Sequence, residues 1–421
     1  MSLALSAGLL PRFTSPAAGT EEPVEAITEE AGITAEAGQR LRVTPLVAEG
    51  ARVAQGAPVA ALRDHPAIRL VAPMAATVAA IRLLPGSVLS EIVLFREAGG
   101  DRQDHPLPGS DTAALRATLQ NAGLWPLLRR RPFGGMPGPD ERPAAIFVMA
   151  ADTRPLAPSP HTAIVHQQAA FGRGLDALGQ LTDGPVYVVE PAGTELLERG
   201  RAGGRAVALP CGPRHPQGLA GLQIHHHRPA TAEAAVWDIH AEDVAAIGTL
   251  IHDGVVPETR LVRVAGSALR QGRLVRTQPG ADLRGLVHGY ALPGAHTIRT
   301  GSPLDGGAAH WLGPRDRQVT VLPRQGRPGA AHWFRAALTR SSLPLPVIPT
   351  AALDQALGGA LPAAALVRAL GAGEDEAAVR LGALSLLEED MALADYVLGG
   401  EANLAAQLRR TLDRVAQEVA P

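Results

Sequence analysis

Short apolar stretches separated by tight turns dominate residues 40–95. Valines recur every six residues over 47–59, with glycines between them. Apolar positions at this spacing, interrupted by turn residues, are typical of short strands that fold back on themselves. The stretch 71–81 predicts a second strand pair, with Pro73 at a turn or sheet edge. The pattern therefore predicts a small all-β module.

From residue 110 the apolar period lengthens, and helical segments alternate with continuous apolar runs. A continuous run bounded by polar residues or proline is typical of a strand buried on both faces of a parallel sheet. Such runs occupy 144–151 and 186–190; helices are predicted at 110–123, at 159–181 from the Ser159-Pro160 start, and within 236–251 up to Gly254. Alternating strands and helices indicate an α/β layer domain over 110–255.

The rest of the chain divides into a second β-rich part and a helical tail. Residues 259–325 again carry short strand signals between Gly/Pro turns, with one short helix after Asp282. Beyond Trp333 the pattern is helical. The last helix follows Asn403, a predicted N-cap, and has an apolar stripe made of Leu404, Leu408, Leu412, Val415 and Val419.

Composition excludes several function classes. The 421 residues contain 39 basic and 41 acidic side chains, a net charge of -2, so no basic footprint for nucleic acid is present. Every basic residue is arginine, which excludes lysine chemistry such as Schiff bases or biotinylation. Cys211 is the only cysteine, which excludes an internal disulfide and a Cys-ligated iron–sulfur cluster.

Targeting signals are also missing from the sequence. No apolar run approaches the roughly 18 residues needed to span a bilayer, and Pro11 interrupts the N-terminal apolar stretch before a secretory signal could form. We therefore expect a cytoplasmic protein.

Two polar clusters are candidates for chemistry. His225, His226 and His227 could ligate a metal, but neighbours on a strand face opposite sides, so a solvated or packed histidine run is the preferred interpretation. No metal site is predicted. The second cluster comprises Asp238, His240, Glu242 and Asp243. Acidic residues at a helix start are more simply explained as caps and as favourable partners of the helix dipole.

A compact arginine cluster, Arg129 to Arg131, precedes the turn Pro132-Phe133-Gly134-Gly135. It could bind phosphate, an acidic partner or lipid headgroups, and a plain solvated charge run is at least as good an interpretation. The chain contains no GxGxxG, GxxxxGK[ST], GxSxG or HExxH motif. Nucleotide binding and the common hydrolase mechanisms therefore have no motif support.

Six collinear segments resemble the A subunits of sodium-translocating NADH:quinone reductases, which are related to the C subunit of the Rnf complex and to the flavoprotein subunit of respiratory complex I. The matching segments are GLWPLLRRRPF (123–133), AAIFVMAADTRPLAPSP (144–160), GPRHPQGLAGLQIH (212–225), VWDIHAEDVAAIGTL (236–250), RLVRTQPGADL (273–283) and LGALSLLEEDMALADYV (381–397). The resemblance extends from residue 6 to near the end of the chain.

The resemblance implies a multidomain α/β and β architecture. It comprises a barrel-sandwich hybrid module of the biotinyl/lipoyl type with its leading segment (1–105), a Rossmann-like domain of the complex I flavoprotein type (106–257), a β-grasp, SLBB-like domain (258–328) and a helical C-terminal domain (329–421). In carrier proteins the modified lysine lies on a hairpin that corresponds to 63–65 here, where no lysine exists.

The same resemblance implies that redox centres have been lost. The flavin-binding relatives use a glycine-rich loop, and its counterpart, Leu124 to Arg129, is bulky and glycine-free. Gly399, Gly400 and Glu401 stand where the family keeps a vestigial Cys-Pro. We expect no FMN and no iron–sulfur cluster on this chain.

The implied role is a peripheral, cofactor-free subunit on the cytoplasmic face of the bacterial inner membrane. It would dock on the membrane-embedded B subunit and could contribute to ubiquinone binding through a loop that contains Arg130, Arg131, Pro132, Phe133 and Met136. A contact of this loop with the B subunit alone is the preferred interpretation. Two departures from the family pattern are a shorter segment between 327 and 349 and Pro-Phe-Gly-Gly in place of a lysine-containing turn.

Two other functions remain open from sequence. One is a soluble flavin- or NAD-dependent oxidoreductase that uses the Rossmann-like domain, against which the missing glycine loop and cysteines argue. The other is an adaptor subunit of a different membrane redox or transport complex.

Overall fold

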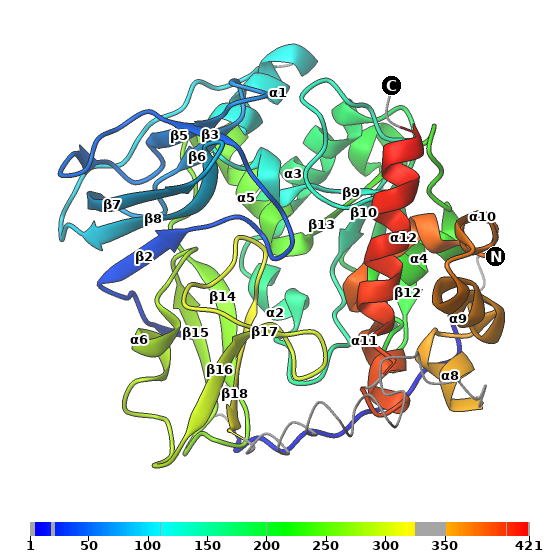
Figure 1. The fold of residues 1–421 in the computed structure, drawn as a ribbon. Helices are drawn as coiled ribbons and strands as arrows, with labels where there is room; N and C mark the ends of the chain where they lie inside the picture. Colours follow the sequence, from blue (N-terminus) through cyan, green and yellow to red (C-terminus); the bar gives the residue numbers. More distant parts are fainter. Residues whose placement is uncertain are drawn as a thin grey trace.

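Three strand-rich parts and a helical part make up the protein, shown by a computed structural model that describes residues 5–17, 22–109, 111–198, 200–324, 351–400 and 402–419. Figure 1 shows the blue N-terminal strands and the yellow-green strands on one side of the central α/β part, and the red helix α12 on the other. The chain is thus a mixed α/β protein with several sheets and a C-terminal helical region.

The first β module confirms the short strands predicted over residues 40–95. It is built from β2 (Glu30–Ile33), β3 (Val43–Pro45), β4 (Arg52–Val53), β5 (Pro58–Leu62), β6 (Arg69–Val71), β7 (Ala76–Leu84) and β8 (Val88–Arg96). They form a four-stranded sheet, β2-β8-β7-β4, and a three-stranded sheet, β3-β5-β6. The exposed turn 63–65 joins β5 to β6.

The α/β domain contains a five-stranded sheet in the order β12-β11-β10-β13-β9. Its elements are α1 (Thr112–Asn121), β9 (Arg129–Arg131), β10 (Ala145–Met149), α2 (Pro160–Ile164), α3 (Gln168–Leu181), β11 (Val186–Pro191), β12 (Ala206–Cys211), α4 (Ala220–His227), β13 (Val236–His240) and α5 (Ala241–Asp253). All five residues of β10 are buried between parallel neighbours β11 and β13, as the apolar run predicts. Only β9 is antiparallel to its neighbour.

The single helix predicted over 159–181 is wrong, because the chain forms two helices with a break at 165–167. The side-chain amide of Gln167 donates to the carbonyl of Ala163 at 3.1 Å, which satisfies an acceptor that the continuing helix would have used. Ser159 holds the N-cap position of α2 but its hydroxyl makes no capping bond.

The second β-rich part forms a six-stranded sheet in the order β1-β15-β14-β18-β16-β17. Its elements are β1 (Val24–Glu25), β14 (Arg260–Ala265), β15 (Arg273–Thr277), α6 (Leu283–Val287), β16 (His296–Thr300), β17 (Gly307–Ala308) and β18 (Gln318–Pro323). The short helix predicted after Asp282 is α6, and Asp282 caps it by accepting from the N–H groups of Arg284 and Gly285.

The C-terminal helices are α8 (Ala351–Ala356), α9 (Ala363–Ala372), α10 (Asp375–Arg380), α11 (Glu388–Val397) and α12 (Leu404–Val419). The stripe of α12 is buried except for Val419, which is 48% exposed. The predicted N-cap is wrong: Asn403 has a φ of 50°, and the Asp395 carboxylate accepts from the N–H groups of Leu404 and Ala405 instead. The shortened segment 327–349 and Glu401 lie outside the described residues.

The leading segment crosses the molecule instead of packing on the first β module. Leu5 joins the core of the C-terminal helices, Leu9 pairs with His215, and the Phe13 ring lies 5.5 Å from the ring of Tyr396. Among the described helices, none has the length and apolar character required to cross a membrane.

Candidate functional site

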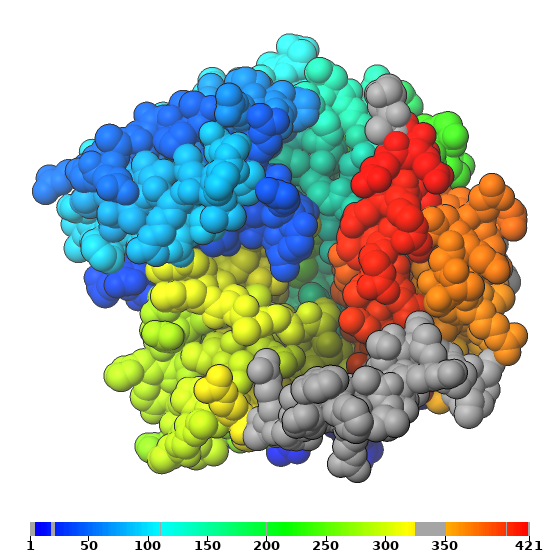
Figure 2. Space-filling view, in the orientation of Figure 1, coloured from blue at the N-terminus to red at the C-terminus, as the bar shows by residue number. Residues whose placement is uncertain are grey.

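A crevice of about 820 Å³ opens beyond the carboxyl ends of β10 and β13. The chain runs from β10 outward to β11 and β12 and returns on the other side at β13, so the sheet order reverses between β10 and β13. In open α/β sheets this switch point is the usual ligand position. Figure 2 shows the surface hollowed between the red helix α12 and the yellow loops of the second β-rich part.

Arg129 of β9 lines this crevice together with Asp238, and Arg131 of the same strand pairs with the same carboxylate. Arg131 is fully buried and pairs with Asp238, while Arg129 donates to both oxygens of the same carboxylate, with an Nη2–Oδ2 distance of 3.0 Å. The interpretation of the arginine cluster as a solvated charge run is therefore wrong. Strand pairing of β9 with β13 places the arginines beside Asp238, which a linear motif does not show.

Two acidic residues at the start of α11 complete the cluster. Glu389 lies 2.6 Å from Arg129 and 3.2 Å from Arg131, and Asp390 lies 3.6 Å from Arg131. Burial would raise the pKa of Glu389, but Arg129 and Arg131 outweigh it and lower the pKa to about 2. Burial, together with the negative charge of Glu389, raises the pKa of Asp390 to about 7. The cluster thus attaches α11 to the α/β sheet.

The acidic cluster 238–243 does more than cap a helix. His240 does cap α5, because its Nδ1 accepts from the N–H of Glu242. Burial keeps the pKa of His240 well below its ordinary value, so the ring is neutral and can accept that bond. The simple helix-start interpretation is incomplete, since Glu242 and Asp243 are buried and pair with Arg317 of the second β-rich part at 3.2 and 2.6 Å.

The predicted quinone or docking loop spans two different cavities. Arg130 pairs with Glu141 at 3.1 Å, and Pro132 is buried. Phe133 is half-buried against the C-terminal helices, and its carbonyl accepts from Arg409 at 2.8 Å. Met136 faces a separate pocket. The structure therefore gathers Phe133 and Arg129 at the crevice and leaves Met136 elsewhere.

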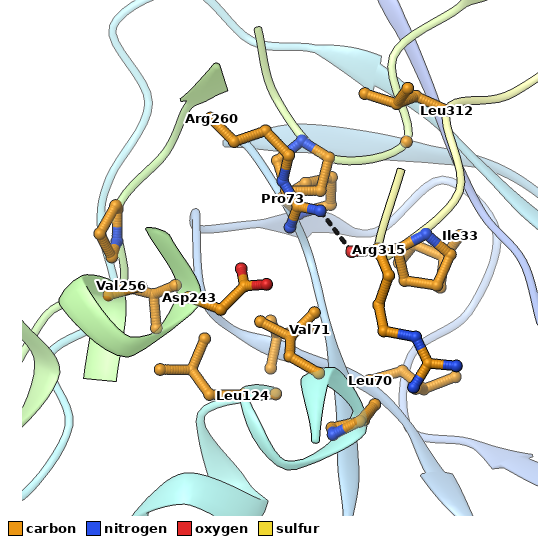
Figure 3. A pocket seen from close by; sticks show the side chains of 18 of the residues that line it. Ile33, Leu70, Val71, Pro73, Leu124, Asp243, Val256, Arg260, Leu312 and Arg315 are labelled. Carbon is orange, nitrogen blue, oxygen red and sulfur yellow. Dashed lines mark hydrogen bonds between the residues drawn. The ribbon is translucent and has the colours of Figure 1, made fainter. Parts of the chain in front are cut away.

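That separate pocket, of about 330 Å³, lies where the first β module, the α/β domain and the second β-rich part meet. Figure 3 shows its apolar walls, including Leu70, Val71 and Val256, with Asp243 and Arg260 pointing into the space. Burial and the nearby charge of Arg317 lower the pKa of Arg260 to about 10. Sequence reasoning missed this pocket, because its residues are distributed over the chain with no motif spacing.

The segment that the resemblance equates with the flavin loop holds a buried tryptophan, while Leu124, Pro126 and Leu127 line the pocket of about 330 Å³. Residues 125–127 form the short helix η1, and the fully buried Trp125 ring contacts Trp237 edge-on at 5.6 Å. Its Nε1 donates to the carbonyl of Pro137 at 3.0 Å. No backbone cradle of glycines is present at this position.

The three consecutive histidines lie at the end of helix α4, so their expected placement on a strand is wrong. Burial lowers the pKa of His225, and burial lowers that of His227 to about 4, which is consistent with a packed position. Within the described ranges, no group of three or more metal-ligating side chains is arranged to hold an ion.

Comparison with known proteins gives a consistent result. A family model described as the NqrA second alpha/beta domain matches residues 110–256. The A subunit of the Na(+)-translocating NADH-quinone reductase of Pseudomonas aeruginosa is 33% identical over 410 residues, covering 90% of this chain and 91% of the relative. That of Vibrio campbellii is 34% identical over 391 residues, covering 85% and 86%.

Among solved structures, an NAD+-reducing [NiFe]-hydrogenase in the air-oxidized state aligns with a TM-score of 0.39 and 13% identity over 75% of this chain and 69% of that one. This similarity is too weak to support a conclusion. The identity to the curated relatives extends over nearly the whole length of both chains. The chain therefore belongs to the family of the A subunits of Na(+)-translocating NADH-quinone reductases.

Proposed function

We propose that this chain is a peripheral, non-redox subunit of a sodium-translocating NADH:quinone oxidoreductase, docked at the cytoplasmic face on the membrane-embedded B subunit. The observation that carries the proposal is the 33% identity over 90% of the chain to the A subunit of such an enzyme. Electrons would pass through the partner subunits. The role of this chain would be assembly, with a contribution to ubiquinone binding.

The proposed architecture is a barrel-sandwich hybrid module (1–105), a Rossmann-like domain (106–257), a β-grasp domain (258–328) and a helical C-terminal domain (329–421). The paired small sheets of the first module and the sheet order β12-β11-β10-β13 support the first two assignments. The antiparallel strands around α6 support the third.

Three features support the absence of FMN and of an iron–sulfur cluster from this chain. The flavin-loop counterpart is occupied by buried Trp125. The switch-point crevice is lined by the paired charges of Arg129 and Asp238. The only thiol, Cys211, is buried, and burial raises its pKa to about 12, which disfavours the ligating thiolate.

The test is affinity purification of the tagged full-length chain from native membranes in mild detergent, followed by mass spectrometry and an absorbance spectrum of the isolated protein. Recovery of the B subunit with the other reductase subunits, and a colourless isolated chain, is the expected result. Recovery with a different membrane complex would instead identify an adaptor, and a yellow or brown chain would overturn the loss of redox centres.

The contribution to quinone binding has its own test. Phe133→Ala in the assembled complex should weaken photolabelling by a ubiquinone analogue, because the half-buried ring lies at the crevice. Phe95→Ala is the matched control, since Phe95 is 49% exposed on the first β module. Equal labelling of both variants and the wild type would exclude a role of Phe133 in quinone binding and leave subunit docking as the role of the loop.

A further inference from the structure

The pocket between the three strand-rich parts combines apolar walls with a small polar end. Gln55 reaches it from the first β module, Asp243 from the first turn of α5, and Arg260 from the start of β14. Its volume of about 330 Å³ is at the lower end of the range of ligand pockets, about 300–1,000 Å³. Each of the three parts therefore contributes at least one polar group.

Three buried oxygens of lining residues have no hydrogen-bond partner among the described residues: Oε1 of Gln55, a residue 5% exposed, Oδ2 of Asp243, a residue 4% exposed, and Oε2 of Glu242. The last of these lies in an ion pair with Arg317 at 3.2 Å, which leaves the oxygens of Gln55 and Asp243 for the argument. The amide of Gln55 is held by the carbonyl of Val256 at 3.0 Å, and Oδ1 of Asp243 is held by Arg317 at 2.6 Å. Buried acceptors without partners cost free energy, so each is expected to meet a donor in the functional state.

Arg260 supplies the matching donors. This residue is 8% exposed, and among the described residues its guanidinium makes one hydrogen bond, to the carbonyl of Pro314. A guanidinium has five N–H donors, so further donors face the cavity. Figure 3 shows the Arg260 guanidinium and the Asp243 carboxylate pointing toward one another, but no ion pair joins them within the part of the chain that the structure describes.

The lining carries charges of both signs, with Arg260, Arg276 and Arg315 against Glu36, Glu242, Asp243 and Glu258, so neither sign of ligand charge is favoured overall. A carboxylate ligand would pair with Arg260 but would be repelled by Asp243, and an ammonium ligand would meet the reverse problem. A neutral group that accepts from the guanidinium and donates to the carboxylate satisfies both. A primary carboxamide has this combination of acceptor and donors in one plane.

We propose that this pocket binds a small uncharged molecule with an apolar ring or chain and a carboxamide-like head, its carbonyl bound by Arg260 and its N–H donors by Asp243 and Gln55. The apolar body lies against Leu70, Val71 and Val256. Phe133 does not line this pocket, and the site needs no partner subunit, so the proposal stands independently of the proposed function.

The first experiment is a ligand-observed NMR titration of the isolated full-length chain with benzamide, N,N-dimethylbenzamide and benzoate. Benzamide should bind in a saturable manner and about tenfold more tightly than either analogue, because one analogue lacks the donors and the other carries a negative charge. Stronger binding of benzoate would make this an anion site. Absence of saturable benzamide binding would leave a water-filled pocket. Either result overturns the proposal.

Two variants locate the site. Asp243→Asn retains an oxygen for Arg317 and places a donor where Oδ2 lies, so it should reverse the preference and favour benzoate over benzamide. Val256→Phe should weaken all binding by filling the cavity while leaving the polar groups unchanged. Phe95→Ala serves as the folded control, and circular dichroism checks each variant. Unchanged affinities in a folded Val256→Phe protein would exclude this pocket as the binding site.

Discussion

The switch-point crevice and the pocket between the three strand-rich parts differ in how they treat buried charge. In the crevice, Arg131 is fully buried and surrounded by acidic partners, with Asp238 shared between two arginines. In the pocket, Arg260 is nearly as buried but bonds a single carbonyl of the described residues. The charges of the crevice therefore hold parts of the protein together, whereas the pocket leaves polar groups available to a ligand.

The charge pairs of the crevice connect two parts of the protein. Arg129 and Arg131 on β9 contact Asp238 on β13 and Glu389 on α11, so the network joins the α/β sheet to the C-terminal helices. At the pocket, charge pairs of Arg317 with Glu242 and Asp243 also join two parts, but Oδ2 of Asp243 and Oε1 of Gln55 have no hydrogen-bond partner among the described residues. In α/β folds this position usually binds a ligand. Here part of it holds the α/β sheet and the C-terminal helices together.

The largest expected effect is that of Arg131→Met. Removing this guanidinium leaves Asp390 and Glu389 buried with less compensation, and breaking a buried pair in this way typically costs about 3–5 kcal/mol of the free energy of unfolding. Urea denaturation at neutral pH measures it. Arg142→Met is the control, because the Arg142–Asp183 pair is exposed (54% and 81%). A loss no larger than that of the control would contradict the role of the network.

A smaller effect is expected from Asp390→Asn, and it depends on pH. The folded-state pKa of Asp390 is raised to about 7, above the ordinary value of 3.8, so the native state holds a proton that the unfolded chain releases. The contribution of protonated Asp390 to the free energy of unfolding is complete below pH 3.8, the ordinary pKa, and is lost as the pH rises to about 7. Asparagine mimics the protonated form and keeps an oxygen for the Leu387 N–H.

The measurement is urea unfolding of the wild type and Asp390→Asn at about pH 5 and pH 8. The wild type should lose more free energy of unfolding over this interval than the variant does. Glu389 does not disturb the comparison, because its lowered pKa, about 2, affects stability only at more acidic pH. Parallel pH dependence in the two proteins would show that Asp390 does not titrate in this range.

The sequence predicted correctly those elements that depend on their own residues or on near neighbours in the chain. The run at β10 is continuously apolar because both faces are covered, and Asp282 and Gly254 cap helices through bonds to nearby residues. Predictions failed where distant or competing groups decide. Asp395, not Asn403, caps α12.

The candidate sites show the same limit more strongly. The arginine cluster was visible in the sequence, but its partners Asp238 and Glu389 lie more than 100 residues away, so the cluster could not be recognised as buried. The pocket was not visible at all, because Arg260 and Asp243 become significant only when three parts of the chain meet. Sequence periodicity reports burial along one element and gives no information about which charged side chains face each other.

The smallest stability effect should follow from Arg260→Met, and it compares the two regions directly. Methionine keeps much of the apolar stem while removing a buried charge that bonds one carbonyl, so loss of that bond is offset by a lower desolvation cost. We expect a change in the free energy of unfolding within about 1 kcal/mol, far below that of Arg131→Met, measured by urea denaturation of the full chain. Benzamide binding should nevertheless be lost. If Arg260→Met destabilises the protein as much as Arg131→Met does, Arg260 stabilises the fold in the same way as the crevice network. The contrast between a structural and a ligand-binding arginine would then be wrong.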